Sequence, residues 1–250
     1  VLNGQKVFIT NGGIADVHLI VATVDPALGI RGQATFIVSR EENEGLKQGK
    51  KERKMGIRAS HTAEVILQDC FVPLENVLGG EEKLTSKLER ARTGESTGRT
   101  SGALRTFEIT RPLVACQAVG IARAALEFAV EYTKERKQFG VPISQHQGVA
   151  FQLADMAVET DCARLLVHRA SWMAGAGQPF AKAEGSMSKL KAGETAVSVT
   201  EKAVQLCGGY GYVKDLPVEK WYRDAKIYTL FEGTSEIQRM VISRALVGGS

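Results

Sequence analysis

The sequence predicts an α+β protein, with an antiparallel β-sheet or small barrel followed by an antiparallel four-helix bundle. Short runs rich in Val, Ile and Phe fill the first third of the chain, with turn residues and no helical stretch between them. From Leu104 onward, apolar residues recur at spacings of three and four, which indicates helices with one buried face. The predicted organisation is a β domain over 1–80, a polar connector over 81–103 and a helical bundle over 104–250.

The β domain is predicted to contain four strands. Turn-forming residues separate them, and no helix lies between consecutive strands, which favours antiparallel pairing over βαβ units. The strongly charged segment 41–54 is predicted to be a solvated loop. The expected strands cover residues 6–10, 17–23, 34–39 and 63–68.

The connector is predicted to be a surface loop or a disordered segment that alters access to the neighbouring site. Charges of both signs fill residues 81–100, and the TGESTGRTSG portion has Gly, Ser and Thr in place of apolar anchors.

Four helices are predicted after the connector. The first begins near Leu104, with Pro112 close to its start, where a missing N–H is tolerated. The second covers about 144–174. The third covers about 182–206 and ends at Gly208-Gly209, which is typical of a helix C-terminus. The fourth begins near Thr234.

Composition excludes several classes of protein. A chain of 250 residues with 44% apolar and 24% charged residues is typical of a globular protein with one or two domains. We expect no membrane span, because no apolar run reaches about 18 residues, and no signal peptide is visible. A net charge of +4, from 32 basic and 28 acidic residues, does not indicate nucleic-acid binding.

Cysteine and histidine usage predicts no metal site and no disulfide framework. The four cysteines are far apart and form no CxxC motif, and the four histidines form no HxxxH or HExxH pattern. Reduced thiols fit a bacterial cytoplasm or a mitochondrial matrix.

Gly208, Gly209 and Gly211 form a glycine cluster that resembles a dinucleotide-binding loop. A long helix precedes the cluster, whereas the dinucleotide fingerprint requires a preceding strand. Two interpretations stay open: a helix cap, and bare backbone amides that approach a phosphate or a cofactor edge.

Glu232 is a candidate general base. It follows Leu230 and Phe231, and Gly233 places no side chain over it. Apolar neighbours favour the protonated form of a carboxylate, which suits proton transfer near neutral pH. The alternative is a carboxylate placed near a helix N-terminus, since Thr234 or Ser235 can cap the helix that follows.

Taken together and in order, eight segments resemble the acyl-CoA dehydrogenase family over nearly the whole chain. The β-then-helical layout fits the middle and C-terminal domains of that family. The segments are LNGQKVFITNGG (2–13), GKKERKMGIRAS (49–60), VPLENVLG (72–79), TRP (110–112), ERKQFG (135–140), QLCGGYGY (205–212), RDAKIY (223–228) and FEGTSEIQR (231–239).

The resemblance implies FAD-dependent α,β-dehydrogenation of an acyl-CoA thioester to a trans-2-enoyl-CoA. Glu232 would remove the α-proton, its backbone N–H would bond the thioester carbonyl, and the β-hydride would pass to flavin N5. In some members the base lies on the first bundle helix. The matching position here is Thr110, which carries no carboxylate, so Glu232 is the better candidate and Glu108 is the runner-up.

The resemblance also implies a set of binding residues. Substrate contacts would come from Glu108, Arg111 and Gly233. FAD contacts would come from Phe8, Ile9, Thr10, Arg136, Gln138, His146, Gln147, Gln205, Gly208, Gly209, Thr234 and Glu236, with several of them reaching the FAD of a neighbouring subunit.

The expected partners are an acyl-CoA substrate, an electron-transfer flavoprotein as acceptor, and further copies of the chain in a homodimer or homotetramer. The N-terminal helical domain of the family is missing, so we expect either that this chain is a fragment or that its start is misassigned. Two alternatives stay open: an acyl-CoA oxidase-like flavoenzyme, and a non-catalytic subunit that completes a partner's FAD site.

Overall fold

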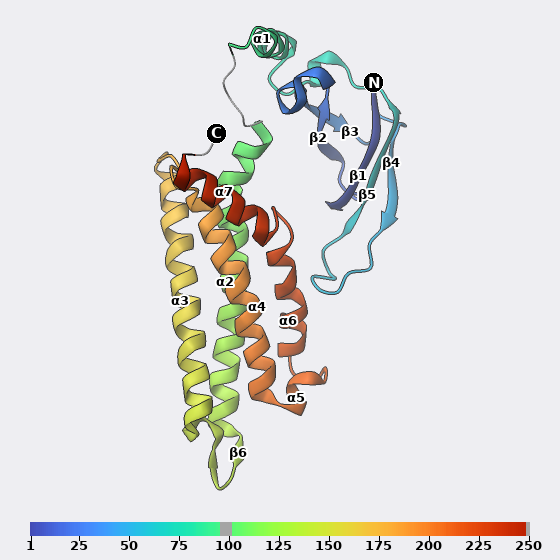
Figure 1. Ribbon diagram of the computed structural model, residues 1–250. Helices are drawn as coiled ribbons and strands as arrows, with labels where there is room; N and C mark the ends of the chain where they lie inside the picture. Colours follow the sequence, from blue (N-terminus) through green and yellow to red (C-terminus); the bar gives the residue numbers. More distant parts are fainter. Residues whose placement is uncertain (96–101, 249–250) are drawn as a thin grey trace. The chain divides into compact units, whose positions relative to one another are not determined.

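The computed structural model describes residues 1–95 and 102–248 (Figure 1). The chain forms two compact units, Val1–Arg105 and Thr106–Ser250. Antiparallel sheets make up the first unit and a helical bundle the second, so the predicted α+β fold class is confirmed. Most of the TGESTGRTSG segment of the predicted connector lies outside the described residues.

The first unit contains two antiparallel sheets. One has three strands in the order β1-β5-β4, and the other pairs β2 with β3. The strands are β1 (Leu2–Thr10), β2 (Val17–Thr23), β3 (Gln33–Ser39), β4 (Leu46–Lys51) and β5 (Thr62–Cys70), with short 3-10 helices η1 (Pro26–Gly32) and η2 (Leu74–Asn76) between or after them.

The core of this unit is built by alternation along β3 and β5. Every second side chain is buried along β3 and along β5 as far as Leu67, as expected for sheets with one face on a core. The buried cluster contains Leu2, Ile20, Ala34, Phe36, Val38, Leu46, Val65, Leu67, Cys70 and Val77.

The prediction of a loop over 41–54 is wrong, because β4 lies within it. Leu46 is buried, and Gln48 pairs with Val65 of β5. The lysines of this segment face away from the core, so an edge strand forms in spite of the charge. Charged side chains are common on edge strands, where they discourage pairing between molecules.

The prediction of a loop over 81–92 is also wrong, because helix α1 (Glu81–Arg92) forms there. Acidic residues occupy its first turn and basic residues its last, which suits the helix dipole. Leu84 packs against the β core and Ala91 is buried. At the C-terminal end of α1, Arg92 Nη2 lies 2.9 Å from Asp25 Oδ2. Asp25 also caps η1, so this ion pair joins the end of α1 to the start of η1.

The second unit is a bundle of long helices with shorter pieces around them (Figure 1). A small hairpin with η3 (Ile143–Gln145) joins α2 to α3. The elements are α2 (Gly102–Glu135), β6 (Lys137–Gln138), β7 (Val141–Pro142), α3 (Gln147–Gly175), α4 (Glu184–Cys207), α5 (Gly209–Tyr212), α6 (Val218–Ala225), η4 (Lys226–Thr229) and α7 (Ser235–Val247).

Helix α4 is the central helix of the bundle. It packs against α3, α5, α6, η4 and α7, and most of its residues are buried. Small residues on it let neighbouring backbones approach closely. A Cβ added to Gly185 would lie 2.3 Å from the Glu108 carbonyl oxygen, and one on Gly193 would lie 2.5 Å from that of Tyr228.

Pro112 lies inside α2, and not near its start as predicted. A proline cannot donate to the carbonyl one turn earlier, which is that of Glu108. Gly185 of α4 approaches this same carbonyl, so the break in the α2 ladder coincides with the closest approach of α4.

One helix in the described part of the chain is long and apolar enough to cross a membrane, namely the Thr106–Glu135 portion of α2. This is weak evidence, since core helices pass the same test. Only 33% of its most apolar window is buried within the bundle. The expectation of no membrane span stays a prediction.

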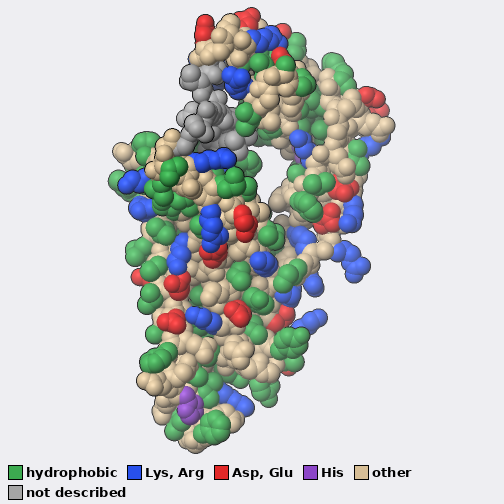
Figure 2. Space-filling view, in the orientation of Figure 1, with side chains coloured by type: hydrophobic (Ala, Val, Ile, Leu, Met, Phe, Trp, Pro, Cys, Tyr) green, Lys and Arg blue, Asp and Glu red, His purple; other side chains and the backbone are tan. Residues whose placement is uncertain are grey.

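Charges of both signs are interspersed on the visible face of the bundle (Figure 2). On the helices of this unit, several charged side chains form pairs one helical turn apart, such as Arg123 with Glu127 and Arg164 with Asp161. This mixture agrees with the small net charge.

The close approach at Gly193 predicts a large effect of one methyl group. Gly193→Ala should lower the free energy of unfolding by about 1–3 kcal/mol, because the backbone of Tyr228 must move. The control is Gly120→Ala, also inside a helix but with nothing within 4 Å of the added Cβ. It should raise stability by up to about 1 kcal/mol. Equal thermal unfolding midpoints for the two variants would contradict this packing.

Candidate active site

The turn before α7 places Glu232 in an uncommon backbone conformation. Glu232 has φ +56° and Gly233 has φ +91°, so two consecutive residues lie in the left-handed region. A residue other than glycine adopts this region only where its surroundings enforce it. Thr234 then begins α7 as predicted, accepting a 3.4 Å hydrogen bond from the Ile237 N–H.

Two side chains hold this turn through its carbonyl groups. Gln238 is fully buried, and its Nε2 donates to the carbonyl oxygens of Glu232 (3.1 Å) and Gly233 (2.9 Å). Lys189 Nζ donates to the Gly233 carbonyl oxygen at 2.6 Å. Gly233 has a φ of +91° that side chains rarely adopt, and a Cβ on it would lie 2.6 Å from Gln238 Nε2, so this position favours glycine.

The Glu232 carboxylate is half-buried and weakly engaged. Thr110 Oγ1 of α2 donates to its Oε2 over a long 3.4 Å contact. Among the described residues, no acceptor is found for the Glu232 backbone N–H. The turn therefore presents a carboxylate and a backbone donor that can both act on a ligand.

Lys189 is a buried cation behind this turn, with 1% of its surface exposed. Burial is the main cause that lowers its pKa to about 8, and Arg111 adds to the effect. The carboxylates of Glu232, Glu236 and Glu194 act in the opposite direction. The pKa of Lys189 is thus lowered by burial and by one neighbouring cation, and raised by three neighbouring carboxylates.

Arg111 and Glu108 form an ion pair on α2 beside the N-terminus of α4. Arg111 is buried and also donates to Ser186 Oγ at 2.7 Å, while the Ser186 N–H donates to Glu108 Oε1 at 3.2 Å. Both Glu108 oxygens thus have protein partners, which supports a role in orienting Arg111. Arg111 Nε, Ser235 Oγ and Gln238 Oε1 are buried without a hydrogen-bond partner in the described chain.

Glu236 lies in the first turn of α7, at the positive end of the helix. Hydrogen bonds from its own backbone N–H and from Thr234 lower its pKa, although the side chain is exposed. It is therefore a surface carboxylate that stays ionised.

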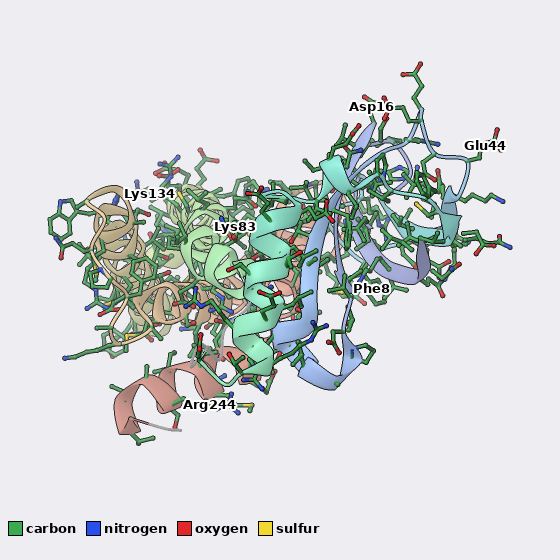
Figure 3. All side chains as sticks on the ribbon, turned by 90° about the horizontal axis from the view of Figure 1, so that it is seen from above. Phe8, Asp16, Glu44, Lys83, Lys134 and Arg244 are labelled. Atoms are coloured by element: carbon green, nitrogen blue, oxygen red, sulfur yellow. The ribbon has the colours of Figure 1, made fainter. Side chains whose placement is uncertain are left out.

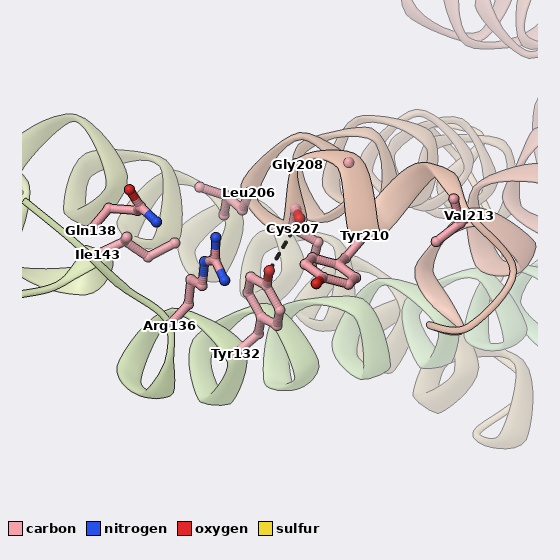
Figure 4. A pocket seen from close by; sticks show the side chains of 10 residues that line it. Tyr132, Arg136, Gln138, Ile143, Leu206, Cys207, Gly208, Tyr210 and Val213 are labelled. Carbon is pink, nitrogen blue, oxygen red and sulfur yellow. Dashed lines mark hydrogen bonds between the residues drawn. The ribbon is translucent and has the colours of Figure 1, made fainter.

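A cavity of about 530 Å³ opens between the end of α2, the hairpin and the end of α4 (Figure 4). Arg136 lies over the Tyr210 ring, 5.9 Å from its centroid, and Tyr132 donates to the Cys207 carbonyl oxygen at 3.3 Å. Burial raises the pKa of Cys207 to about 11 and also raises that of Tyr132. The cavity thus combines one guanidinium with aromatic and neutral walls.

The structure brings four of the predicted FAD residues together in this cavity: Arg136, Gln138, Gly208 and Gly209. Gly208 has φ +59° and caps α4, as predicted for a helix end. Three other predicted FAD residues do not line the cavity, although they are close in sequence to residues that do: Gln205, His146 and Gln147. His146 contacts the Gln138 carbonyl oxygen at 3.3 Å, and its ring meets that of Phe139 edge-on.

Sequence reasoning missed the aromatic and apolar lining of the cavity. Tyr132 lies one helical turn before Arg136 and so shares its face, a spacing that could have identified it. Tyr210 lies between the glycines that were singled out. The other missed residues are Ile143, Leu206, Cys207 and Val213.

The predicted flavin-contacting residues of the β unit lie at the end of β1. The register with β5 shifts between Lys6 and Ile9, and Phe8 has φ +58° with 72% of its surface exposed (labelled in Figure 3). Ile9 is half-buried and Thr10 is exposed. An irregular strand end with an exposed aromatic ring suits a binding surface.

These features define a two-unit protein with a carboxylate on a constrained turn and a separate cationic, aromatic cavity. Family models match both units: "Acyl-CoA dehydrogenase, middle domain" over residues 1–70 and "Acyl-CoA dehydrogenase, C-terminal domain" over 100–247. The chain belongs to the acyl-CoA dehydrogenase family, whose members are FAD-dependent flavoproteins.

Similar proteins support this assignment along the whole chain. The short-chain specific acyl-CoA dehydrogenase of Clostridium acetobutylicum is 44% identical over 97% of this chain and 60% of its own length. The acryloyl-CoA reductase (NADH) of Anaerotignum propionicum is 45% identical over 99% of this chain and 58% of its own. The butyryl-CoA dehydrogenase structure from Megasphaera elsdenii is 43% identical, with a TM-score of 0.87, and covers 98% of this chain and 60% of its own. The chain thus spans about three-fifths of the length of these relatives.

The buried pair on α2 predicts a measurable stability difference. Glu108→Gln should lower the free energy of unfolding by about 2–4 kcal/mol, because it leaves the buried Arg111 guanidinium without its counter-charge. Glu127→Gln is the control, since Glu127 pairs with Arg123 on the exposed face of the same helix. It should cost less than about 0.5 kcal/mol. Equal losses in urea unfolding would show that Arg111 does not depend on Glu108.

Proposed function

We propose that the protein containing this chain catalyses the FAD-dependent α,β-dehydrogenation of an acyl-CoA thioester to a trans-2-enoyl-CoA. The observation that carries this proposal is the Glu232 turn, which combines a weakly engaged carboxylate with an N–H that has no acceptor among the described residues. Family membership supplies the reaction class.

In the proposed reaction, Glu232 is the base. The Cα–H bond of the thioester breaks, and the proton forms a bond with a carboxylate oxygen of Glu232. Negative charge then develops on the thioester oxygen, where the Glu232 backbone N–H can donate a hydrogen bond that strengthens as the charge grows. Phe231 precedes Glu232 in the chain, and its ring meets that of Tyr228 edge-on with 5.2 Å between the ring centroids, so the base follows an apolar aromatic pair.

FAD, when bound, supplies the acceptor for the β-hydride. The donor chemistry of the cavity fits part of this cofactor, because Arg136 offers charge to a phosphate and Gly208 offers bare backbone near a helix end. Phe8, Ile9 and Thr10 would hold the flavin, and His146, Gln147 and Gln205 would lie along the cofactor. Thr234 and Glu236 would contact it at the start of α7.

For the substrate, we propose that Arg111 and Gly233 contact the CoA-bearing thioester and that Glu108 orients Arg111. Relatives named as short-chain specific and as butyryl-CoA dehydrogenase favour a short acyl chain. A similar solved structure, named as an electron transferring flavoprotein of Acidaminococcus fermentans, favours such a protein as the electron acceptor. Oxygen consumption with acyl-CoA would instead identify an oxidase.

We also propose that the chain assembles with further copies of itself. Helix α3 carries four exposed apolar side chains at seven-residue spacing, each with 60–66% of its surface exposed: Phe151, Val158, Leu165 and Trp172. This spacing keeps them on one face, as in helix–helix interfaces. Such a stripe is expected to be covered in the assembled protein.

Glu232→Gln tests the proposed base at nearly constant size. In the full-length, flavin-loaded protein the variant should keep its FAD but lose anaerobic bleaching of the flavin by butyryl-CoA by roughly 10²–10⁴-fold. Glu131→Gln, an exposed carboxylate that pairs with Lys134 on α2, is the control and should bleach at the wild-type rate. Bleaching by Glu232→Gln at a near-wild-type rate would remove Glu232 from the mechanism.

A further inference from the structure

We propose that Lys189 is a positioning residue for Glu232: its ammonium anchors the Gly233 carbonyl and places a positive charge behind the base. This proposal rests on the proposed function of Glu232. It assigns a role to a side chain that the sequence motifs did not single out.

The placement of Lys189 is unusual for a lysine. Lys189 lies on α4 with 1% of the residue exposed, and its Nζ donates to the neutral Gly233 carbonyl oxygen at 2.6 Å. Among the described residues, no carboxylate comes within 4.0 Å of it. Burying an ammonium costs free energy unless it is paired or solvated. A buried cation whose close partner is the turn beside Glu232 therefore points to a role in that turn.

Lys189 and Gln238 share the work of holding the turn. Gln238 reaches the carbonyls of both Glu232 and Gly233 from α7, whereas Lys189 reaches that of Gly233 from α4. Together they fix two consecutive left-handed residues from two different helices. Gln238 is neutral, so Lys189 alone adds charge to this arrangement.

The other charged groups around the turn largely pair with one another. On α2, Arg111 is paired with Glu108, and Arg239 of α7 pairs with Glu194 of α4 at 2.7 Å. Glu236 of α7 is exposed and interacts with Arg239 and with Lys226 of η4. Lys189 is thus the buried cation near Glu232 that has no carboxylate at close range in the described chain. A nearby positive charge favours the ionised form of a carboxylate, which is the form a base requires.

The test compares three variants of the full-length, flavin-loaded protein. Lys189→Met removes both the charge and the donor, and Lys189→Gln removes the charge but keeps a donor. Lys191→Met is the matched control, because Lys191 lies on the same helix but pairs with Glu159 of α3. Two quantities are measured: hydrogen–deuterium exchange of the peptide containing Leu230–Gln238, in which the N–H groups at both ends of the turn donate hydrogen bonds, and the pH profile of anaerobic flavin reduction by butyryl-CoA.

The proposal predicts a distinct result for each variant. Lys189→Met should raise exchange of the turn by about tenfold or more, since a buried hydrogen bond to a charged group is lost. Its flavin reduction should slow at neutral pH, with the acidic limb moved about half a unit or more to higher pH. Lys189→Gln should show the shifted limb with less change in exchange. Lys191→Met should match the wild type in both measurements, and FAD content should not change in any variant.

The results also separate this proposal from the proposed function. If Lys189→Met leaves both the exchange and the acidic limb as in the wild type, Lys189 does not position Glu232. If Lys189→Met does not fold, an unshifted limb in Lys189→Gln overturns the charge role. If the wild type itself fails to reduce its flavin with butyryl-CoA or other acyl-CoA thioesters, the proposed function fails, while the exchange comparison still decides whether Lys189 holds the turn.

Discussion

Three hydrogen bonds to two neighbouring carbonyl groups are the constraint on which the Glu232 site depends. They come from Lys189 of α4 and Gln238 of α7, and they hold Glu232 and Gly233 at positive φ. A left-handed residue that carries a side chain is strained, and the strain persists only where several contacts enforce it. Here the donors are almost fully buried, so the turn is held from within the bundle.

The packing of the other helices around α4 holds the helix that carries Lys189 in place. Helix α4 is lined with small residues, which lets α2 and η4 approach it closely at Gly185 and Gly193. At the N-terminus of α4, Ser186 ties the helix to the Glu108–Arg111 pair, where Pro112 interrupts the α2 hydrogen-bond ladder. Packing and electrostatics therefore converge on one end of the bundle.

Hydrophobic periodicity in the sequence predicted the fold class. The helix end at Gly208 and the helix start at Thr234 could also be predicted, because helix caps depend on single residues. Local signals failed where tertiary contacts decided the outcome. Leu46–Lys51 has a loop-like composition and becomes a strand only because β5 offers an edge. Glu81–Arg92 is polar, and the β core that buries Leu84 and Ala91 completes its helical face. The short helix α6 was also missed.

The same distinction holds for the site. Glu232 and the glycines stood out because their neighbours in sequence are unusual, and family segments added Arg136 and Gln138. Lys189 could not be found in this way. A lysine in a predicted helix is expected to be exposed, and only the fold shows that this one is buried. The lining residues Tyr132 and Tyr210 were missed for the related reason that the cavity joins two distant helix ends.

The most direct measurement is a crystal structure of the full-length, flavin-loaded protein with a bound acyl-CoA analogue that cannot be oxidised. The account predicts a Glu232 carboxylate oxygen about 3–3.5 Å from the α-carbon of the thioester, with the turn still held by Lys189 and Gln238. A Glu232 side chain directed into bulk water, with Glu108 or another group nearest the α-carbon, would contradict the account.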